Sequence, residues 1–221
     1  DGDSPTVSYT QTSGYVNDGV GNALEDFSNQ AVTNNLDTTA PSIAITSDDS
    51  TLNVGDTATI TFTLSEASTD FTAADVSVSG GTLSGFSGSG TSYTATFTPT
   101  DNSTADGVVS VASSKFSDAA GNANADGADA NNSVTMTVDT VEPTVSSAAT
   151  ASGNSITLTL SEAVSGTPTA GDFTIGGVAS NPTVSSVSVS GSTVTLTLSA
   201  AMTDGDSPTV SYTQTSGYVN D

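Results

Sequence analysis

The chain has 221 residues and carries 24 acidic side chains against one basic side chain and no histidine, so its formal charge is −23. Such a charge repels nucleic acid and anionic membrane surfaces, and neither is expected as a partner. Cysteine is absent, which excludes disulfides, thiolate catalysis and zinc–sulfur sites, and no apolar run is long enough for direct membrane insertion.

The same eighteen residues, DGDSPTVSYTQTSGYVND, open and close the sequence. Asp1 corresponds to Asp204 and Asp18 to Asp221, which is an offset of 203 residues (204 − 1). A repeat of this length indicates a tandem array, of which the chain spans a little more than one period. Near-identical copies favour a part whose use increases with copy number, such as a stalk, a spacer or a fibre, over a single catalytic site.

A second, weaker repeat divides this period into two related modules. LDTTAP at 36–41 is similar to VDTVEP at 138–143, and TFTLSEA at 61–67 is similar to TLTLSEA at 157–163. The spacing predicts modules of about 100 residues, a common size for a β-sandwich domain. We name them the first-type and the second-type module. The predicted domains are the C-terminal part of a second-type module in 1–36, a complete first-type module in 37–139, and the N-terminal part of the next second-type module in 140–221, which stops before its last strands.

Alternation of apolar and polar residues with a period of two predicts the strands. In chain order, the apolar faces begin with Ala58, Ile60, Phe62 and Leu64, followed by Tyr93, Ala95 and Phe97, by Val134, Met136 and Val138, by Ile156, Leu158 and Leu160, and by Val194, Leu196 and Leu198. Threonine, a β-branched residue, takes many of the opposite positions. No segment shows a helical period of useful length. We therefore predict an all-β fold of tandem antiparallel β-sandwiches, with about seven short strands in each module.

Acidic residues gather in the loops predicted at the two ends of each sandwich. In a seven-stranded antiparallel sandwich, the linker before the first strand, the loop after the second strand and the loop before the last strand share one end. For the first-type module, this end collects Asp37, Glu66, Asp75, Asp118 and Asn122, and the opposite end carries Asp101 and Asp106. For the second-type module, the first end collects Asp139, Glu142, Glu162 and Asp172, together with Asp18 and Asn22 from the last loop, and the opposite end carries Asp204 and Asp206.

These loop residues are the predicted metal ligands. With one basic side chain in the sequence, the carboxylates must be solvated or neutralised by bound cations. Clustered Asp, Asn and Glu oxygens favour hard ions, and Ca²⁺ suits flexible loops best. Bound where two modules meet, the ion would hold neighbouring modules of the same chain in one orientation. The alternatives are a solvated acidic surface like that of halophilic proteins and, for single residues, a capping role in a turn or a solvated strand end.

The order of several motifs resembles a known family. LDTTAP, TITFTLSEA, FTAADVSVSGGTL, GTSYTATFTPTD and FSDAAGNA make the first-type module similar to the bacterial immunoglobulin-like repeats of giant RTX-type adhesins exported by type I secretion. TLTLSEAVSG, GDFTI, VTLTLS and VNDGVGNAL make the second-type module resemble the repeat of a cyanobacterial swimming-motility surface protein. The resemblance implies Ig-like sandwiches joined end to end and stiffened by Ca²⁺ at their junctions, in an extracellular protein of the bacterial cell surface. The GGxGxD nonapeptide of the secretion end is missing from this sequence.

These observations lead to one main functional hypothesis and three alternatives. The main hypothesis is a structural extender, or stalk, in a large extracellular bacterial repeat protein that serves adhesion or surface display. The first alternative is a building unit of a self-assembling filament, sheath or surface layer, which requires contacts with other copies of the same protein. A carbohydrate- or protein-binding module is less favoured, because tryptophan is absent and aromatic residues are few. An enzyme is not expected, because the chain lacks histidine and cysteine and has no recognisable nucleophile with a base.

Overall fold

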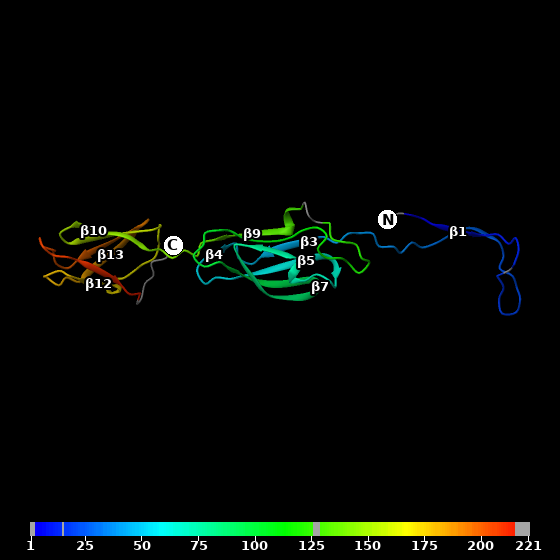
Figure 1. Cartoon of the computed structure of the whole chain (residues 1–221), viewed down its shortest axis with the longest axis horizontal. Coiled ribbons are helices and arrows are strands. Elements are labelled where there is room, and N and C mark those ends of the chain that lie inside the picture. Colours follow the sequence, from blue (N-terminus) through cyan, green and yellow to red (C-terminus); the bar gives the residue numbers. More distant parts are fainter. Residues whose placement is uncertain (1–2, 15, 126–128, 215–221) are drawn as a thin grey trace. The chain divides into compact units, whose positions relative to one another are not determined.

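A computed structural model describes residues 3–14, 16–125 and 129–214. The chain divides into two compact units, the first formed by Asp1–Thr100 with Ala105–Val138 and the second by Asp101–Thr104 with Asp139–Asp221. Figure 1 shows that strands dominate, which confirms the all-β prediction. Helical structure in the described ranges is limited to single 3₁₀ turns at Ala73–Asp75 (η1), Ala130–Asn132 (η2) and Ala170–Asp172 (η3). None of the helices in these ranges has the length and hydropathy needed to cross a membrane.

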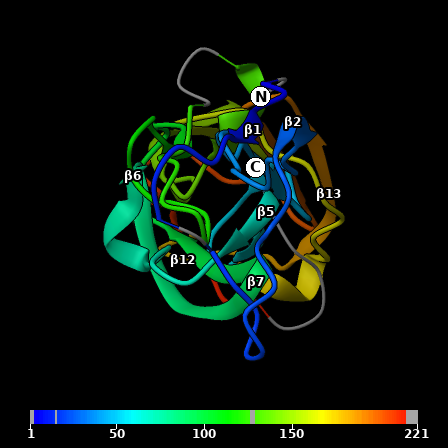
Figure 2. The same cartoon turned by 90° about the vertical axis from the view of Figure 1, so that its right-hand side faces the viewer.

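Two sheets form the sandwich of the first-type module. One sheet has the strand order β3–β5–β7 and the other has the order β4–β9–β8–β6. Their bounds are β3 Ile43–Ser47, β4 Thr51–Leu52, β5 Ala58–Ser68, β6 Val76–Ser79, β7 Gly81–Pro99, β8 Gly107–Val111 and β9 Ser133–Val138. β5 and β7 lie side by side in both views (Figure 1 and Figure 2). In this antiparallel pair Phe62 lies opposite Tyr93. The seven strands agree with the predicted number.

One pair of strands among the described residues of this module is parallel, whereas the other pairs of its two sheets are antiparallel as predicted. Thr51 and Leu52 of β4 pair in parallel with Thr137 and Val138 of β9. β3 and β4 belong to different sheets, so the chain crosses the sandwich between them and forms no hairpin there. Without a hairpin, nothing requires antiparallel pairing. A strand of two residues is also too short to show alternation in the sequence.

The apolar core of the first unit anchors the loop that follows β5. Phe71, in that loop, is 4% exposed and packs its ring against those of Phe62, Phe86, Tyr93 and Phe116, with centroids 5.1–5.6 Å apart. The hydroxyl of Tyr93 donates a hydrogen bond of 2.9 Å to the carbonyl oxygen of Ser68 at the end of β5. Aromatic pairs in these geometries add to the burial of apolar area. The end of β5 is therefore held by the core, which matters for the acidic residues beside it.

The second unit has one larger and one smaller sheet. The larger sheet has the order β10–β11–β14–β13, and the smaller pairs β12 with β15, both antiparallel. The bounds are β10 Val145–Ser152, β11 Ser155–Leu160, β12 Phe173–Gly176, β13 Val184–Ser190, β14 Thr193–Leu198 and β15 Thr209–Tyr212. Alternate residues of β11 and β14 form the core, with Ile156, Leu158, Val194, Leu196 and Leu198 at most 5% exposed. β10 is exposed along its whole length.

Two strands at the start of the chain form an antiparallel pair, β1 (Thr6–Tyr9) with β2 (Phe27–Ala31). Thr6 lies opposite Ala31 and Tyr9 opposite Phe27, and the rings of Tyr9 and Phe27 are stacked with centroids 6.1 Å apart. The four residues of β1, TVSY, are also those of β15. The same sequence therefore forms a strand in both places, with a different partner in each.

Substitution of Gly107 by alanine should destabilise the first unit. A Cβ atom at this position would lie 2.6 Å from Cζ of Phe97, whose side chain is fully buried. Overpacking of this kind costs about 1–3 kcal/mol, which urea unfolding followed by circular dichroism would detect. Gly153→Ala is the control, because a Cβ atom there meets nothing nearer than 3.9 Å. Equal stability of the two variants would contradict the packing argument.

Candidate metal centre

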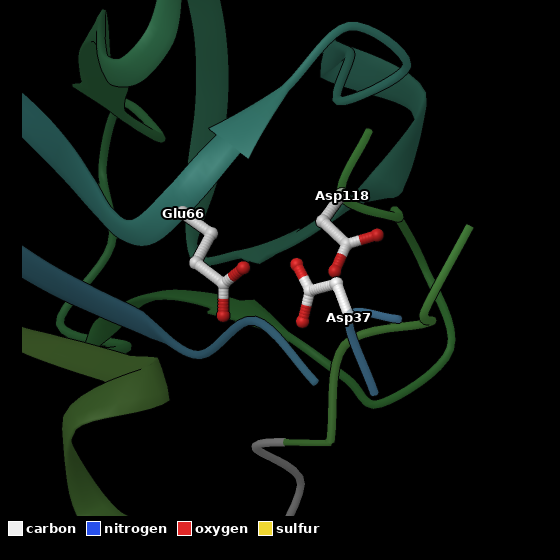
Figure 3. A group of neighbouring side chains, drawn as sticks. All are labelled: Asp37, Glu66 and Asp118. Atoms are coloured by element: carbon white, nitrogen blue, oxygen red, sulfur yellow. The ribbon is translucent and has the colours of Figure 1, made fainter. Parts of the chain in front are cut away.

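Three carboxylates from separate segments meet at one end of the first-type module. Asp37 precedes β3, Glu66 lies near the end of β5, and Asp118 lies in the loop between β8 and β9. One carboxylate oxygen from each lies within 4.8 Å of the others. In Figure 3 the carboxylate of Asp37 lies between those of Glu66 and Asp118. Among the described residues, no other group of three acidic side chains comes this close.

Backbone hydrogen bonds hold the linker beside the end of β5. The backbone N–H of Ser65 donates to the carbonyl oxygen of Ser42 at 2.9 Å, and the N–H of Ser42 donates to Oγ of Ser65 at 2.8 Å. Pro41, between Asp37 and these bonds, is buried. Asp37 itself accepts a hydrogen bond from the N–H of Thr39 at 3.0 Å, which is the pattern of an Asx turn. The linker therefore passes directly beside Glu66.

Asp118 is fixed by the loop that follows it. Its Oδ1 accepts hydrogen bonds from the N–H groups of Ala120 at 2.9 Å and Asn122 at 2.8 Å, and its Oδ2 accepts one from Nδ2 of Asn122 at 2.8 Å. Nδ2 of Asn122 also donates to the carbonyl oxygen of Asp37 at 3.2 Å. Gly121 has φ of 90°, a conformation that favours glycine. Asn122 thus connects the loop to the linker through its amide nitrogen.

The pKa values of Glu66 and Asp118 are shifted in opposite directions. Partial burial, followed by repulsion from Asp37 and Asp118, raises the pKa of Glu66 above its ordinary value of 4.5. Hydrogen bonds, above all the one from the side chain of Asn122, lower the pKa of Asp118 below 3.8. Asp118 is also only 9% exposed. A nearly buried anion beside two other carboxylates attracts a cation, and three oxygen ligands of this hardness suit Ca²⁺.

Asp70, which sequence reasoning missed, reinforces this end of the module. Its Oδ1 accepts a hydrogen bond from the N–H of Ser117 at 2.9 Å and one from Oγ of Ser68 at 2.7 Å, and its Oδ2 accepts one from Oγ of Ser117. The side-chain bond from Ser117 is the largest cause of the lowered pKa of Asp70. Ser117 directly precedes Asp118, so Asp70 ties the loop after β5 to the loop that carries Asp118. Since the partners are 47 residues apart, no local pattern reveals this contact.

Asp75 and Asp172 lie outside the group of three and have a local role. Oδ2 of Asp75 accepts hydrogen bonds from the N–H and Oγ1 of Thr72, at 2.8 and 2.9 Å. Asp172 does the same with Thr169, at 2.7 and 2.9 Å, and is 1% exposed. Both pairs form capping boxes around 3₁₀ turns. The spacing Thr-x-x-Asp is the signal in the sequence that points to this turn-forming role.

The acids predicted at the opposite ends are not gathered into such a group. Asp206 repeats the Thr-x-x-Asp arrangement with Thr203, at 2.6 and 3.0 Å, and also accepts a hydrogen bond from the N–H of Ala179. The backbone bond from Thr203 is the largest cause of its lowered pKa. Asp101, Asp106 and Asp204 are exposed.

The other predicted ligands of the second-type module have local partners or remain apart. Asp139 accepts a hydrogen bond from the N–H of Val141 at 3.2 Å, and Glu162 accepts one from Oγ of Ser161 at 3.4 Å. Glu142 is exposed. Asp18 and Asn22 reproduce the bonds of Asp118 and Asn122, with the N–H and Nδ2 of Asn22 at 2.9 and 2.8 Å from Asp18. These bonds lower the pKa of Asp18, so the loop geometry is the same in both module types.

Comparison with known proteins gives each module a class. Residues 37–138 match the family model described as "Bacterial Ig-like domain", and residues 138–217 match the one described as "Putative flagellar system-associated repeat". The chain therefore contains a bacterial Ig-like domain and a flagellar-associated repeat, which confirms this part of the resemblance seen in the sequence. The narrower likeness to RTX-type adhesins and the export by type I secretion stay predictions.

Comparison with individual proteins shows less similarity than the family models do. No curated protein sequence matches the chain. A solved structure of FdeC, described as a broadly conserved Escherichia coli adhesin, is similar over 85% of this chain and 70% of that chain, with 17% identity and a TM-score of 0.41. A likeness this distant does not transfer a function.

Substitution of Glu66 by glutamine should stabilise the calcium-free protein at about pH 7 and have little effect at about pH 4. The folded state holds the Glu66 proton more tightly than the unfolded chain, so the stability contributed by this group falls as the pH rises from 4.5 through the folded pKa. Glutamine keeps the shape and never gains the charge. Urea unfolding in EDTA at both pH values measures the difference.

The matched control is Asp56→Asn, which removes one charge outside the group. Oδ2 of Asp56 accepts a hydrogen bond from the N–H of Asn53 at 3.0 Å, and the asparagine oxygen can keep it. The same pH-dependent gain in both variants would mean that general charge repulsion, and not the burial of Glu66 and its two acidic neighbours, accounts for the effect.

Proposed function

We propose that Asp37, Glu66 and Asp118 bind Ca²⁺ and that the chain is a calcium-stiffened extender segment of a large bacterial surface protein. The observation that carries this proposal is the approach of three carboxylates within 4.8 Å in a chain with one basic side chain. All the donors are hard oxygens, and Ca²⁺ takes six to eight such ligands. The three side chains supply part of this shell, and backbone oxygens or water would complete it.

The position of Asp37 gives the ion a mechanical role. Asp37 belongs to the linker, whereas Glu66 and Asp118 belong to the sandwich that follows it. An ion held by all three residues ties the linker to the end of β5 and to the loop between β8 and β9. Without the ion, repulsion among the carboxylates favours release of the linker. Calcium would therefore control how firmly the linker is held against the first-type module. The partners of this contact are the neighbouring modules of the same chain, whose connection the bound ion would stiffen.

Tandem repetition supports the extender role. The sequence repeats with an offset of 203 residues, and an Ig-like domain and a flagellar-associated repeat lie within one period. Repeated sandwiches increase length with copy number, which suits a stalk that displays a distal domain for adhesion. Outside the cell calcium is abundant, so a Kd of about 10⁻⁴–10⁻³ M is sufficient. The role is structural and involves no catalysis.

Calcium at about 10 mM should raise the thermal midpoint of the first unit by at least roughly 10 °C. For a Kd of about 10⁻⁴ M, this concentration stabilises the folded state by about 2.7 kcal/mol, and each kcal/mol shifts the midpoint of a domain of this size by about 4–8 °C. Calorimetry with CaCl₂ and with EDTA measures the shift. Asp118→Asn should lose most of the shift.

Two controls separate site binding from charge screening. NaCl at the same ionic strength tests whether the net charge of −23 responds to salt alone. Asp56→Asn removes a charge elsewhere and should keep the calcium response. A thermal midpoint that moves equally with both salts, or equally in the Asp56→Asn and Asp118→Asn variants, would contradict the proposed site.

Calcium should also protect the peptide bond between Leu36 and Asp37 from chymotrypsin. Leu36 is 71% exposed and lies directly before the proposed ligand. If the ion holds Asp37, cleavage after Leu36 should slow several-fold in CaCl₂, as mass spectrometry of the fragments would show. Asp118→Asn leaves the cleaved sequence intact and should abolish the protection. Leu24, 43% exposed, is an internal control whose cleavage should not respond to calcium; a parallel change there would indicate an effect on the protease.

A further inference from the structure

A series of contacts connects the apolar core of the first unit to the carboxylate of Asp70. The ring of Phe71 packs against that of Tyr93, and the N–H of Phe71 donates to Oγ of Ser68 at 3.2 Å. Ser68 is 2% exposed, and its carbonyl oxygen accepts the hydrogen bond from the hydroxyl of Tyr93. Oγ of Ser68 donates to Oδ1 of Asp70 at 2.7 Å. Buried groups therefore hold the Asp70 carboxylate, although Asp70 itself is exposed.

Asp70 in turn binds the residue directly before Asp118. Its Oδ1 accepts a hydrogen bond from the N–H of Ser117 at 2.9 Å, and its Oδ2 accepts one from Oγ of Ser117. Asp118 also pairs with Ser68 in an isolated antiparallel bridge. Hydrogen bonds to an ionised carboxylate are roughly twice as strong as neutral ones, and two of them together fix a geometry. The backbone from which the Asp118 side chain extends is therefore held in place through Asp70.

Asp70 does not belong to the group that would hold the ion. Among the residues that the structure describes, the acidic side chains that bring their oxygens within 4.8 Å of one another are Asp37, Glu66 and Asp118. Both carboxylate oxygens of Asp70 already accept hydrogen bonds from serines. The geometric influence of Asp70 on the group therefore acts through the loop that carries Asp118.

We propose that Asp70 is a positioning residue that sets the calcium affinity of Asp37, Glu66 and Asp118 without binding the ion, an inference that rests on the proposed function. In the metal-free protein, repulsion among the three carboxylates favours their separation. The hydrogen bonds of Asp70 oppose this movement for Asp118. Folding then brings the ligands together in advance, so that less of this cost falls on the binding step. Hydrogen-bonded supports of metal ligands typically contribute about 10–100-fold to the affinity.

Isothermal titration calorimetry of the whole chain with CaCl₂ tests this role. Asp70→Ala should weaken calcium binding at least about tenfold. Ser117→Ala removes the Oγ donor but no charge and should also weaken it. The double variant should bind as Asp70→Ala does, because both changes break the same contact. Asp70→Asn should keep most of the affinity, because its amide can still bond to both groups of Ser117. Asp118→Asn identifies which heat belongs to the proposed site.

Asp48→Ala is the matched control for the loss of one charge. Oδ1 of Asp48 accepts a hydrogen bond from the N–H of Thr59 at 2.6 Å, so this carboxylate also holds a loop of the first unit. Asp48 directly follows β3, whereas Asp37 precedes β3. The variant should therefore keep the calcium affinity of the natural chain. Circular dichroism in EDTA checks that each variant is folded, and if Asp70→Ala is not, Ser117→Ala decides the outcome.

The outcomes separate this inference from the proposed function. A natural chain that binds no calcium contradicts the proposed function, and Asp70 then has no site to position. If the natural chain binds calcium and neither Asp70→Ala nor Ser117→Ala changes the affinity, the positioning role alone is wrong. An equal loss in Asp70→Ala and Asp70→Asn, or in Asp70→Ala and Asp48→Ala, would also overturn it, because charge and not position would then account for the effect.

Discussion

Repulsion between carboxylates that the fold forces together is the constraint on which the end of the first-type module depends. The aromatic cluster around Phe71 holds the end of β5. The loop after β8 is braced by Asp70 and Asn122, so Glu66 and Asp118 cannot move apart freely. Partial burial, with repulsion from Asp37 and Asp118 added to it, raises the pKa of Glu66. Core packing thus maintains an acidic group that a divalent cation is suited to neutralise.

Aspartate has two local roles in this chain, and they differ in what they leave available to an ion. In the Thr-x-x-Asp turns of Asp75, Asp172 and Asp206, one carboxylate oxygen accepts bonds from the threonine three residues earlier. In the loops of Asp18 and Asp118, the carboxylate accepts bonds from residues that follow it. The first arrangement uses the acid to close a turn, and the second orients it. The number of acids in the loops therefore exceeds the number that the fold brings together.

Identical sequence has different neighbours at the two places where the eighteen-residue repeat occurs. β1 pairs with β2, and β15 pairs with β12. Each pairing uses one edge of the same strand sequence, and the complete sheet of the first unit uses both edges of β8. Strand partners thus follow from which segments are within reach, since the alternation of side chains is the same in each copy.

The period-two pattern by itself determined the all-β class and the core strands, because alternation reports directly which residues face a core. The internal repeats indicated the module spacing. The loop order of a seven-stranded sandwich placed Asp37, Glu66 and Asp118 at one end, and the structure brings these three residues together. Only the tertiary structure decided that Asp75 turns to its own backbone, that Asp70 joins two loops, and that β4 pairs in parallel. The physical reason is that these features depend on the choice of hydrogen-bond partner, which the sequence pattern does not reveal. For Asp75 two kinds of partner compete, and for Asp70 and β4 the partners lie far away in the sequence.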